Sequence, residues 1–443
     1  MKKYDSYKDS GIEWIGEIPG HWETKKIKYR CYVKARVGWK GLKSDEFLTD
    51  GYSYLVTGSD FKNDSVNWKN CYHIDQERYE EDPYIQIQNE DLLITKDGTI
   101  GKLAIVKELD KPACLNSGIF VVRSTNKDFS TTFLFWILKS KVFTQFNDST
   151  SYGSTIQHLY QNVFVEFSFP FPHHQEQTAI THYLDRKTVE IDELIADKKR
   201  LLERYEEEKT ALINQAVTKG INPDVPMKDS GIEWLGEVPA QWEVKRLKYV
   251  IKSVTGGGTP STANPLFWNG HIPWVSAKDM KKNYIFSSED YITEEAITAS
   301  ATNYIEDERV IIVVRSGILK HTFPVAINKV PISINQDLKA FEPKPNISTE
   351  FLFWKLKGQS KDILTFCNKM GATVDSIEMQ YLIDFPFSFP SIEEQHLIVS
   401  YIKTECARID AKKAKTEKLI DLLTEYRTAL ISEVVTGKVK VIE

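Results

Sequence analysis

The chain has 443 residues, of which 41% are hydrophobic, 12% aromatic and 27% charged, and its net charge is −5. This length is too great for one ordinary core and predicts about two or three globular domains. The longest aliphatic run, Val310 to Val314, is far too short to span a bilayer, and the first residues show no secretory signal. Five scattered cysteines without metal-binding spacing indicate reduced thiols in a cytoplasmic protein.

The acidic balance excludes a simple basic nucleic-acid-binding module, because no large segment has an excess of Lys and Arg. A DNA-binding function would need cations gathered on one face, or a partner that neutralises much of the phosphate charge.

Residues 1–172 form the first predicted domain. Short runs of β-branched and aromatic residues predict strands at Tyr52–Thr57, Leu92–Thr95 and Ile119–Val122, and a helix is expected over Thr131–Phe146. The segment Thr95–Lys102 places two cations and two hydroxyls beside two glycines. Such a loop can donate hydrogen bonds to phosphate or reach into a groove, although an ordinary hairpin turn would explain it too.

Residues 173–220 form a predicted long helix. Apolar residues recur at helical spacing from Ile180 to Ala216, with Glu, Lys and Arg between them, as on an amphipathic helix or a coiled-coil strand. Gly220 and the prolines that follow it end the helix. Some 44 residues without Pro or Gly would extend about 66 Å at 1.5 Å per residue.

The chain then repeats itself. Lys8 to Tyr29 (KDSGIEWIGEIPGHWETKKIKY) and Lys228 to Tyr249 (KDSGIEWLGEVPAQWEVKRLKY) are identical at 15 of 22 positions. Further matches follow at an offset of 218, such as Phe133–Trp136 with Phe351–Trp354. A period of about 220 residues exceeds any solenoid repeat, so a whole domain with its helix is duplicated.

Residues 221–390 form the second predicted domain, with a strand at Arg309–Val314 and a helix at Thr349–Cys367. Residues 391–443 form a second long helix, which a capping box of Ser391 with Glu394 begins and Gly437 ends. One apolar stripe on each long helix is most simply buried by pairing the two. The predicted fold is α+β, with two globular domains separated by two long antiparallel helices and related by a pseudo-two-fold axis.

Between the matched segments the two halves diverge. Nothing in Arg36 to Asp60 resembles Val254 to Asp279. A shared framework with unlike centres is what two recognition domains of different specificity would show. Drift after duplication is the alternative, but it should erode the shared ends as much as the centres.

Motifs for catalysis are missing from the sequence. There is no G-x-G-x-x-G fingerprint for a dinucleotide or methyl donor and no phosphate-binding P-loop, because Gly98–Lys102 has the wrong spacing. The triplet Glu207-Glu208-Lys209 lies on the predicted helix and is interpreted as solvated surface rather than as part of a nuclease site. The nine histidines form no ligand cluster. No catalytic residue and no metal ligand is predicted, and binding is favoured over catalysis.

The sequence resembles the specificity subunits of type I restriction–modification systems. The resemblance covers essentially the whole chain and rests on DSGIEWIGEIPGHW with its second copy, DLLITKDGTIGKLAIV, GSTIQHL, VVRSGILKH and FPSIEEQ. It implies a non-catalytic subunit with two target-recognition domains, each reading half of an asymmetric, gapped DNA site. It also implies that the helices dock two adenine-methyltransferase subunits, which bind S-adenosylmethionine, and that restriction–translocase subunits use ATP and Mg²⁺. The chain itself is expected to bind no cofactor.

Loop residues with cationic, hydroxyl or amide side chains are the candidate DNA contacts: Arg36, Lys40, Thr57, Lys96, Asp97, Thr99, Lys102, Asn116, Ser154, Thr155, Gln157, His158, Thr259, Ser276, Lys278, Arg315, Ser316, Lys320, Asn335, Gln336 and Thr373. Apolar and aromatic residues of the helices are the candidate contacts with partner subunits: Ile191, Leu202, Tyr205, Leu212, Ile409, Leu423, Tyr426 and Leu430.

Two other functional classes remain open on the sequence. One is a coiled-coil scaffold that binds only proteins, and the other is a self-sufficient DNA methyltransferase or nuclease subunit. Gel shifts that show no sequence preference with partner subunits present would support the protein scaffold. Methylation by the purified chain alone would support the self-sufficient enzyme.

Overall fold

The computed structural model describes residues 2–36, 42–43, 46–126, 128–150, 158–369 and 374–442. The chain divides into two compact units, which we describe separately. The first unit contains residues 1–199 with 418–443, and the second contains residues 200–417. Each unit therefore combines one globular domain with a segment of both long helices. The domain boundaries predicted at residues 172, 220 and 390 stay predictions.

The first unit is built on two sheets. Their strands are β4 (Cys31–Lys34), β5 (Ser53–Val56), β6 (Phe61–Lys62), β7 (Ser65–Val66), β8 (Tyr72–Ile74), β9 (Leu92–Thr95), β10 (Leu103–Ile105), β11 (Ala113–Leu115) and β12 (Ile119–Ser124). The larger sheet has the order β4-β12-β9-β10-β7-β6, and the smaller has the order β11-β5-β8. Two further pairs join β1 (Tyr7–Asp9) to β2 (Glu17–Pro19) and β3 (Glu23–Lys26) to β13 (Ser168–Phe171).

The second unit repeats most of this topology, but its larger sheet has five strands instead of six and its smaller sheet four instead of three. Its strands are β17 (Ile251–Gly256), β18 (Trp268–Val275), β19 (Tyr284–Ile285), β20 (Asp290–Ile292), β21 (Tyr304–Ile305), β22 (Val310–Val313), β23 (Val325–Asn328), β24 (Ile332–Ile334) and β25 (Leu338–Pro343). Their orders are β17-β25-β22-β23-β19 and β20-β18-β24-β21. The two-stranded pairs recur as β14 (Met227–Asp229) with β15 (Glu237–Pro239) and β16 (Glu243–Arg246) with β26 (Pro386–Phe389). Strands β22 and β25 therefore correspond to β9 and β12.

The predicted strands are confirmed within one residue at each end, except that β12 continues two residues beyond the predicted end at Val122. Each predicted domain helix is wrong in one respect. The first is two helices, α2 (Thr131–Leu138) and α3 (Lys141–Thr150), because Ser140 Oγ accepts the backbone N–H of Val142 at 3.2 Å and starts a new helix. The second is α7 (Thr349–Gly358) and α8 (Ser360–Phe366), which separate where Gln359 leaves helical geometry. Short helices complete the domains: α1 (Gln76–Glu80), α4 (Gln161–Phe164), α6 (Glu294–Ala299) and α9 (Met379–Asp384).

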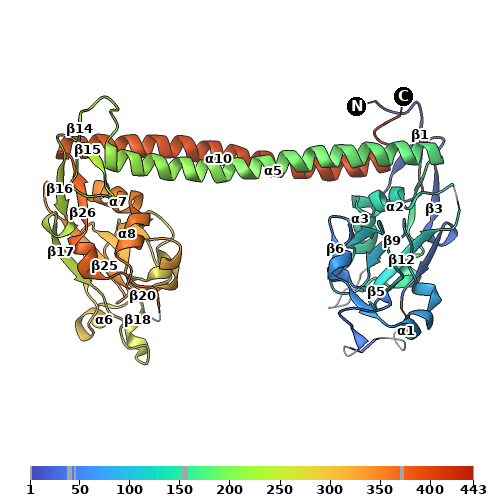
Figure 1. The fold of residues 1–443 in the computed structure, drawn as a ribbon, viewed down its shortest axis with the longest axis horizontal. Helices are drawn as coiled ribbons and strands as arrows, with labels where there is room; N and C mark the ends of the chain where they lie inside the picture. Colours follow the sequence, from blue (N-terminus) through green and yellow to red (C-terminus); the bar gives the residue numbers. More distant parts are fainter. Residues whose placement is uncertain are drawn as a thin grey trace. The chain divides into compact units, whose positions relative to one another are not determined.

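Buried apolar side chains explain how these layers hold together. In the first unit α2 packs against β9, β10 and β12 (Figure 1), and its Phe133, Leu134 and Ile137 are buried. The framework tryptophans Trp22 and Trp242, which the repeated motif shares, are both fully buried in their own units. Burial of an aromatic side chain of this size stabilises a fold by roughly 1.5–3 kcal/mol. The repeated N-terminal motif is therefore a packing element.

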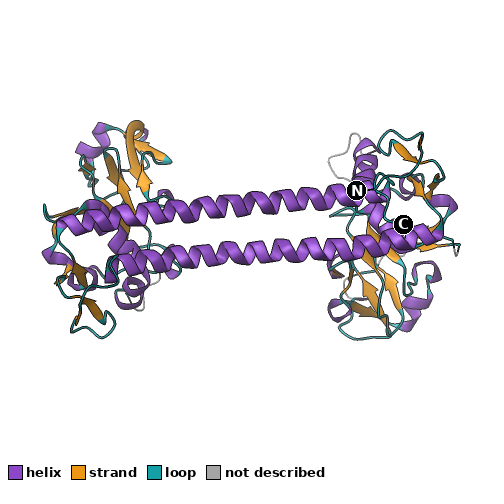
Figure 2. Ribbon diagram, turned by 90° about the horizontal axis from the view of Figure 1, so that it is seen from above, coloured by secondary structure: helices purple, strands orange, loops and turns teal. Residues whose placement is uncertain are grey.

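The long helices are α5 (His174–Lys219) and α10 (Ile392–Val435), and each is one unbroken helix (Figure 2). Ser391 Oγ caps the start of α10 by accepting the Glu394 backbone N–H at 3.3 Å, which is one of the two hydrogen bonds of the predicted capping box. Glu394 Oε1 accepts the Trp242 indole N–H at 3.0 Å. Gly220 and Gly437 follow the helix ends with φ of +80° and +72°, a left-handed conformation that glycine adopts without strain. The predicted helix ends are confirmed.

The two helices pair antiparallel within the second unit. Lys209 Nζ donates to Asp410 Oδ1 at 2.7 Å, and Glu206 forms an ion pair with Lys413. Residue numbers thus increase along α5 while those of the paired residues decrease along α10, as in an antiparallel pair. In the first unit Arg427 Nη2 donates to Asp192 Oδ2 at 3.0 Å.

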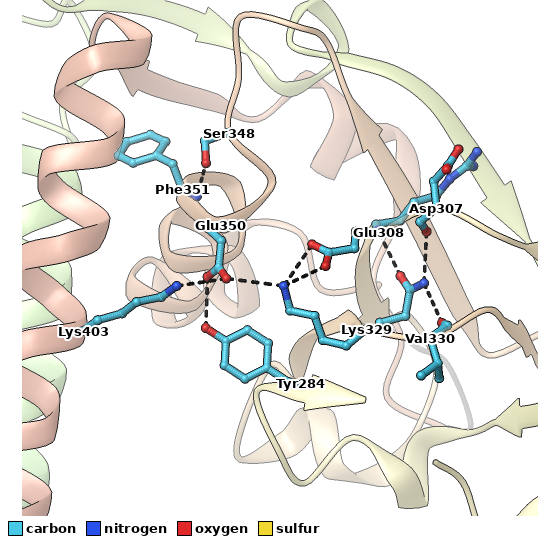
Figure 3. Close-up of polar contacts among 11 residues, drawn as sticks. Tyr284, Asp307, Glu308, Lys329, Val330, Ser348, Glu350, Phe351 and Lys403 are labelled. Carbon is cyan, nitrogen blue, oxygen red and sulfur yellow. Dashed lines mark hydrogen bonds and ion pairs between the residues drawn. The ribbon is translucent and has the colours of Figure 1, made fainter. Parts of the chain in front are cut away.

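A polar network fastens α10 to the second domain (Figure 3). Glu350 of α7 forms ion pairs with Lys403 of α10 at 3.0 Å and with Lys329 at 3.6 Å. The Tyr284 hydroxyl donates a hydrogen bond to the Glu350 carboxylate at 3.0 Å. Burial and the Glu350 carboxylate raise the pKa of Tyr284 to about 12, so the phenol stays protonated and keeps donating. Because Glu350 pairs with a lysine of α10 and with a lysine of the domain, the network joins this domain to its helix.

Candidate nucleic-acid interface

Two parallel strands of the first domain end side by side. Strand β5 pairs with β11 so that Val56 faces Leu115, and the backbone N–H of Asn116 donates to the Val56 carbonyl at 2.9 Å. Because parallel strands present their carboxyl ends at the same edge, Thr57 and Asn116 lie together there. The structure thus joins two candidates that the sequence separates widely.

A capping box shapes the turn that follows β5. Asp60 Oδ2 accepts hydrogen bonds from the Thr57 backbone N–H at 2.7 Å and from Thr57 Oγ1 at 2.8 Å. The Asp60 side chain is buried, and burial raises the pKa of its carboxyl group. A Cβ atom at Gly58 would lie 2.9 Å from Thr95 Cγ2, so this turn packs directly on the end of β9.

The loop after β9 adds charged groups to the same edge. The Lys96 backbone N–H donates to the Gly118 carbonyl at 2.8 Å, which places the loop beside the turn after β11. Lys96 Nζ donates to Asp97 Oδ2 at 3.1 Å, and the other oxygen of Asp97 forms an ion pair with His158. Thr99 and Lys102 are exposed on this loop. Lys96, Asp97 and His158 thus form one polar cluster at the strand ends.

The second domain has the same arrangement. The Asn335 backbone N–H donates to the Val275 carbonyl at 3.0 Å, because β24 lies parallel to β18. The next residue, Ser276, forms a capping box with Asp279, whose Oδ2 accepts from the Ser276 N–H at 2.8 Å and from its Oγ at 3.0 Å. Thr57 with Ser276 and Asn116 with Asn335 are each 219 positions apart. The two clusters are therefore equivalent.

This equivalence corrects the expectation that Arg36 to Asp60 and Val254 to Asp279 have nothing in common. Both segments end in the pattern S/T-x-x-D, at Thr57–Asp60 and Ser276–Asp279. Their lengths and remaining residues differ, which hides the match from a comparison of letters. Asp60, Asp279 and Asp337 are cluster residues that the sequence interpretation missed, and the repeated S/T-x-x-D pattern was the signal for the first two.

The cation of the second cluster is Arg315, which follows β22. Its Nε donates to Asp337 Oδ1 at 2.6 Å, and 55% of its side chain is exposed. Asp337 is itself held by Asn335, whose Oδ1 accepts the Asp337 backbone N–H at 3.0 Å. Gln336 lies between them, is exposed, and accepts the Thr259 hydroxyl at 2.6 Å. Four of the predicted residues, Thr259, Arg315, Asn335 and Gln336, therefore come together in this cluster.

Other predicted DNA contacts lie elsewhere or serve the fold. Arg36 is 3% exposed and donates from Nε to the Leu115 carbonyl at 2.9 Å, so its side chain packs inside the domain. Lys278 is exposed and bound to Glu289 and Asp290, which raise its pKa. Ser316 caps a short 3-10 helix after Arg315, and Lys320 is the last residue of that helix. Lys40, Ser154, Thr155, Gln157 and Thr373 fall outside the described residues.

The predicted partner-binding residues of the helices are mostly covered by the chain itself. Ile191 and Leu430 are buried in the first unit and Ile409 in the second, so their side chains stabilise these units directly. Leu202, Tyr205, Leu212 and Leu423 are half-buried, whereas Tyr426 is 45% exposed. Other exposed apolar residues on the helices are Val189, Leu194, Leu397, Tyr401, Leu419 and Leu422. The buried side chains of Ile191, Ile409 and Leu430 therefore leave little surface for contact with a partner subunit, which corrects the prediction for these three residues.

Among the residues that the structure describes, no group of three or more His, Cys, Asp or Glu side chains is placed to hold a metal ion. None of the described helices is long and apolar enough to cross a membrane.

The chain thus contains two domains with corresponding strands, and each has a polar cluster with a different cation at its strand ends. The model of the type I restriction modification DNA specificity domain matches residues 19–204 and 239–420. The chain belongs to this family. Each of its two matched segments is thus a DNA specificity domain of the type I restriction modification family.

Named relatives agree with this assignment. The specificity subunit of the type I restriction enzyme EcoR124I/EcoR124II of Escherichia coli is 36% identical over 229 residues, which are 51% of this chain and 50% of that protein. The match to this relative thus spans about half of its length. A putative type I restriction enzyme MjaX specificity subunit of Methanocaldococcus jannaschii is 24% identical over 444 residues, 96% of each chain.

Solved structures share the fold. The crystal structure of the HsdS subunit from Thermoanaerobacter tengcongensis matches with a TM-score of 0.58 at 15% identity, over 95% of this chain and 98% of that one. A chain from a structure described as the basis of complex assembly and conformational transition of the type I R-M system matches with a TM-score of 0.71 at 15% identity, over 95% and 99%.

Proposed function

We propose that this chain reads an asymmetric, bipartite DNA sequence, with each globular domain recognising one half-site. The observation that carries the proposal is the pair of equivalent strand-end clusters. They share their hydroxyl, carboxylate and amide framework at Thr57 and Ser276, Asp60 and Asp279, and Asn116 and Asn335, but differ in their cations. A common framework with unlike base-reading groups suits two different half-sites.

The long helices form, in this proposal, an antiparallel coiled coil that separates the two domains. Support comes from the ion pairs within each unit. Asp192 of α5 pairs with Arg427 of α10, and Lys209 of α5 pairs with Asp410 of α10. The two pairs are separated by the same number of residues on each helix. One uninterrupted register accounts for both pairs. Such a pair of helices would act as a ruler for the gap between half-sites, as dimer geometry does for other DNA-binding proteins.

The chain's acidic balance supports a shared role in DNA binding. A net charge of −5 supplies little overall attraction for phosphate, so partner subunits would neutralise much of the DNA backbone. We propose that the helices dock two adenine-methyltransferase subunits and that restriction–translocase subunits join this core. S-adenosylmethionine would then belong to the methyltransferases, and ATP with Mg²⁺ to the restriction subunits. The exposed apolar residues of the helices, such as Leu422 and Leu397, are suited to such contacts.

The test is to sequence adenine methylation in cells that carry the methyltransferase subunits with and without this chain. We expect one gapped, asymmetric motif that is methylated only when the chain is present. Methylation that is identical in both strains would refute the proposal. Methylation by the purified chain alone would instead support a self-sufficient enzyme.

A further inference from the structure

Each domain has a carboxylate beside the cation at the equivalent position, but the two carboxylates come from different positions in the chain. Lys96 follows β9 and Arg315 follows the equivalent strand β22. Lys96 Nζ donates to Asp97, the next residue, at 3.1 Å, whereas Arg315 Nε donates to Asp337, which precedes β25, at 2.6 Å. The position equivalent to Asp337 in the first domain is Gly118, again 219 residues earlier.

Gly118 shows how the first domain accommodates this change. Its φ is +98°, and a Cβ atom there would lie 3.7 Å from Asp97 Oδ2. The Asp97 carboxylate therefore lies beside the position from which Asp337 projects in the second domain. Drift alone gives no reason to restore a carboxylate next to the cation after it has moved along the sequence. The pair of charges is kept, so it has a role in both domains.

Arg315 has the geometry of a group that is held ready for a ligand. Asp337 engages Nε only, and the terminal amino groups Nη1 and Nη2 donate no hydrogen bond to any residue within the described ranges. Asp337 is fixed in turn by Asn335, whose Nδ2 donates to Asp337 Oδ2 at 3.4 Å. An arginine fixed at Nε still presents donors that match the O6 and N7 acceptors of guanine in the major groove.

A phosphate contact is the main alternative for an exposed arginine. Phosphate binding needs charge but little orientation, and it carries no sequence information. Here the side chain is oriented by a carboxylate, which also cancels its net charge. Such an ion pair weakens the attraction for phosphate and favours directional hydrogen bonds to a base edge. Base reading therefore fits the pair better than phosphate neutralisation.

We propose that Arg315 is a specificity-determining residue that reads one guanine in the half-site of the second domain, with Asp337 as its positioning residue. Lys96, positioned by Asp97, takes the equivalent role in the first domain. This inference rests on the proposed function and adds to it the base and the atoms that are read.

The experiment uses the full chain with the methyltransferase subunits of its own system and sequences genomic adenine methylation for Arg315→Gln, Asp337→Asn and Lys252→Gln. Lys252 is the matched control, because its side chain is 65% exposed and it also forms one ion pair, with Glu342 at 2.6 Å. We expect Arg315→Gln to lower the preference for guanine at one position of the second half-site by about 10-fold or more. The first half-site should stay unchanged. Asp337→Asn should relax the same position less, and Lys252→Gln should leave the motif intact.

A second measurement works even if Arg315→Gln abolishes methylation. Gel shifts of the wild-type complex are run on the target DNA with 7-deazaguanine, which lacks the N7 acceptor, at each guanine in turn. We expect one substitution in the second half-site to weaken binding by the wild-type complex and to have no effect on Arg315→Gln. Uniformly weaker methylation with an unchanged motif, or equal sensitivity of both complexes at every guanine, would overturn the inference. Absence of any gapped motif for the wild type would instead overturn the proposed function.

Discussion

The Gln177 side-chain oxygen accepts a hydrogen bond from the Ser130 backbone N–H at 3.0 Å and so ties the start of α5 to the start of α2. Its amide nitrogen donates to the carbonyls of Pro172 at 2.9 Å and Asp128 at 3.1 Å. The second unit repeats this contact, since Gln395 accepts from the Ser348 N–H at 2.8 Å. Both glutamines are 0% exposed. One buried amide thus joins each domain to its long helix.

Replacing Gln177 with Leu should destabilise the first unit by about 2–4 kcal/mol. The leucine would leave one buried N–H and two carbonyls without partners, and each unsatisfied group costs about 1–3 kcal/mol before the structure relaxes. Denaturant unfolding monitored by tryptophan fluorescence would measure the loss. Gln76→Leu is the matched control, because Gln76 is exposed and its side chain donates to Glu80, and it should change stability by less than about 0.5 kcal/mol. Equal effects of the two substitutions would contradict the structural role of Gln177.

Exchanging residues 1–172 for the equivalent domain of another specificity subunit should change one half of the methylated motif only. The reason is that the strand-end cluster of the first domain, around Lys96, is built entirely from residues of that segment. Methylation sequencing of the hybrid is the measurement. A hybrid in which both half-sites change would show that the two domains do not read DNA independently.

Inserting seven residues into α5 near residue 200 and seven into α10 near residue 418 should lengthen the gap between half-sites. Seven residues add about 10.5 Å and nearly two full helical turns, so the apolar stripe keeps its direction. At about 3.4 Å per base pair, the gap should grow by about three base pairs while both half-sites stay the same. The methylated motif of the variant gives the answer directly. A gap of unchanged length would mean that the helices are not the ruler.

The stability of the second unit should rise with pH because of Lys355. This side chain is 0% exposed, donates to Ser388 Oγ at 2.9 Å and to the Val217 carbonyl at the end of α5, and burial lowers its pKa well below the usual value. Between the lowered pKa and the unfolded value of about 10.4, the unfolded chain carries a proton that the folded chain lacks. Unfolding therefore takes up a proton, and raising the pH opposes it.

Lys355→Met should flatten this pH dependence by up to about 1.36 kcal/mol per pH unit, since one proton is involved. Urea unfolding at several values between pH 7 and pH 9.5 would measure the slope. Lys361→Met is the control, because Lys361 is exposed on α8 and should leave the slope unchanged. If Lys355→Met keeps the wild-type slope, the amine is charged in the folded protein.

Sequence patterns predicted the elements whose signals are local. The apolar spacing from Ile180 to Ala216 predicted α5, and the Ser391–Glu394 capping box predicted where α10 begins. The predicted helix Thr131–Phe146 failed at Ser140, because a side-chain cap there competes with continued helix and apolar periodicity does not register such a cap.

The sequence alone determined the duplication and the two long helices, because identical letters and helical periodicity are carried by neighbouring residues. The tertiary structure decided which residues form the clusters. Arg315 meets Asp337, and Thr57 lies beside Asn116, only because strand pairing brings their backbones together. The register of a sheet depends on packing across the whole domain, and no local pattern in a single sequence records it. For the same reason, only the tertiary structure shows that Asp97 in the first domain and Asp337 in the second are paired with cations at equivalent positions.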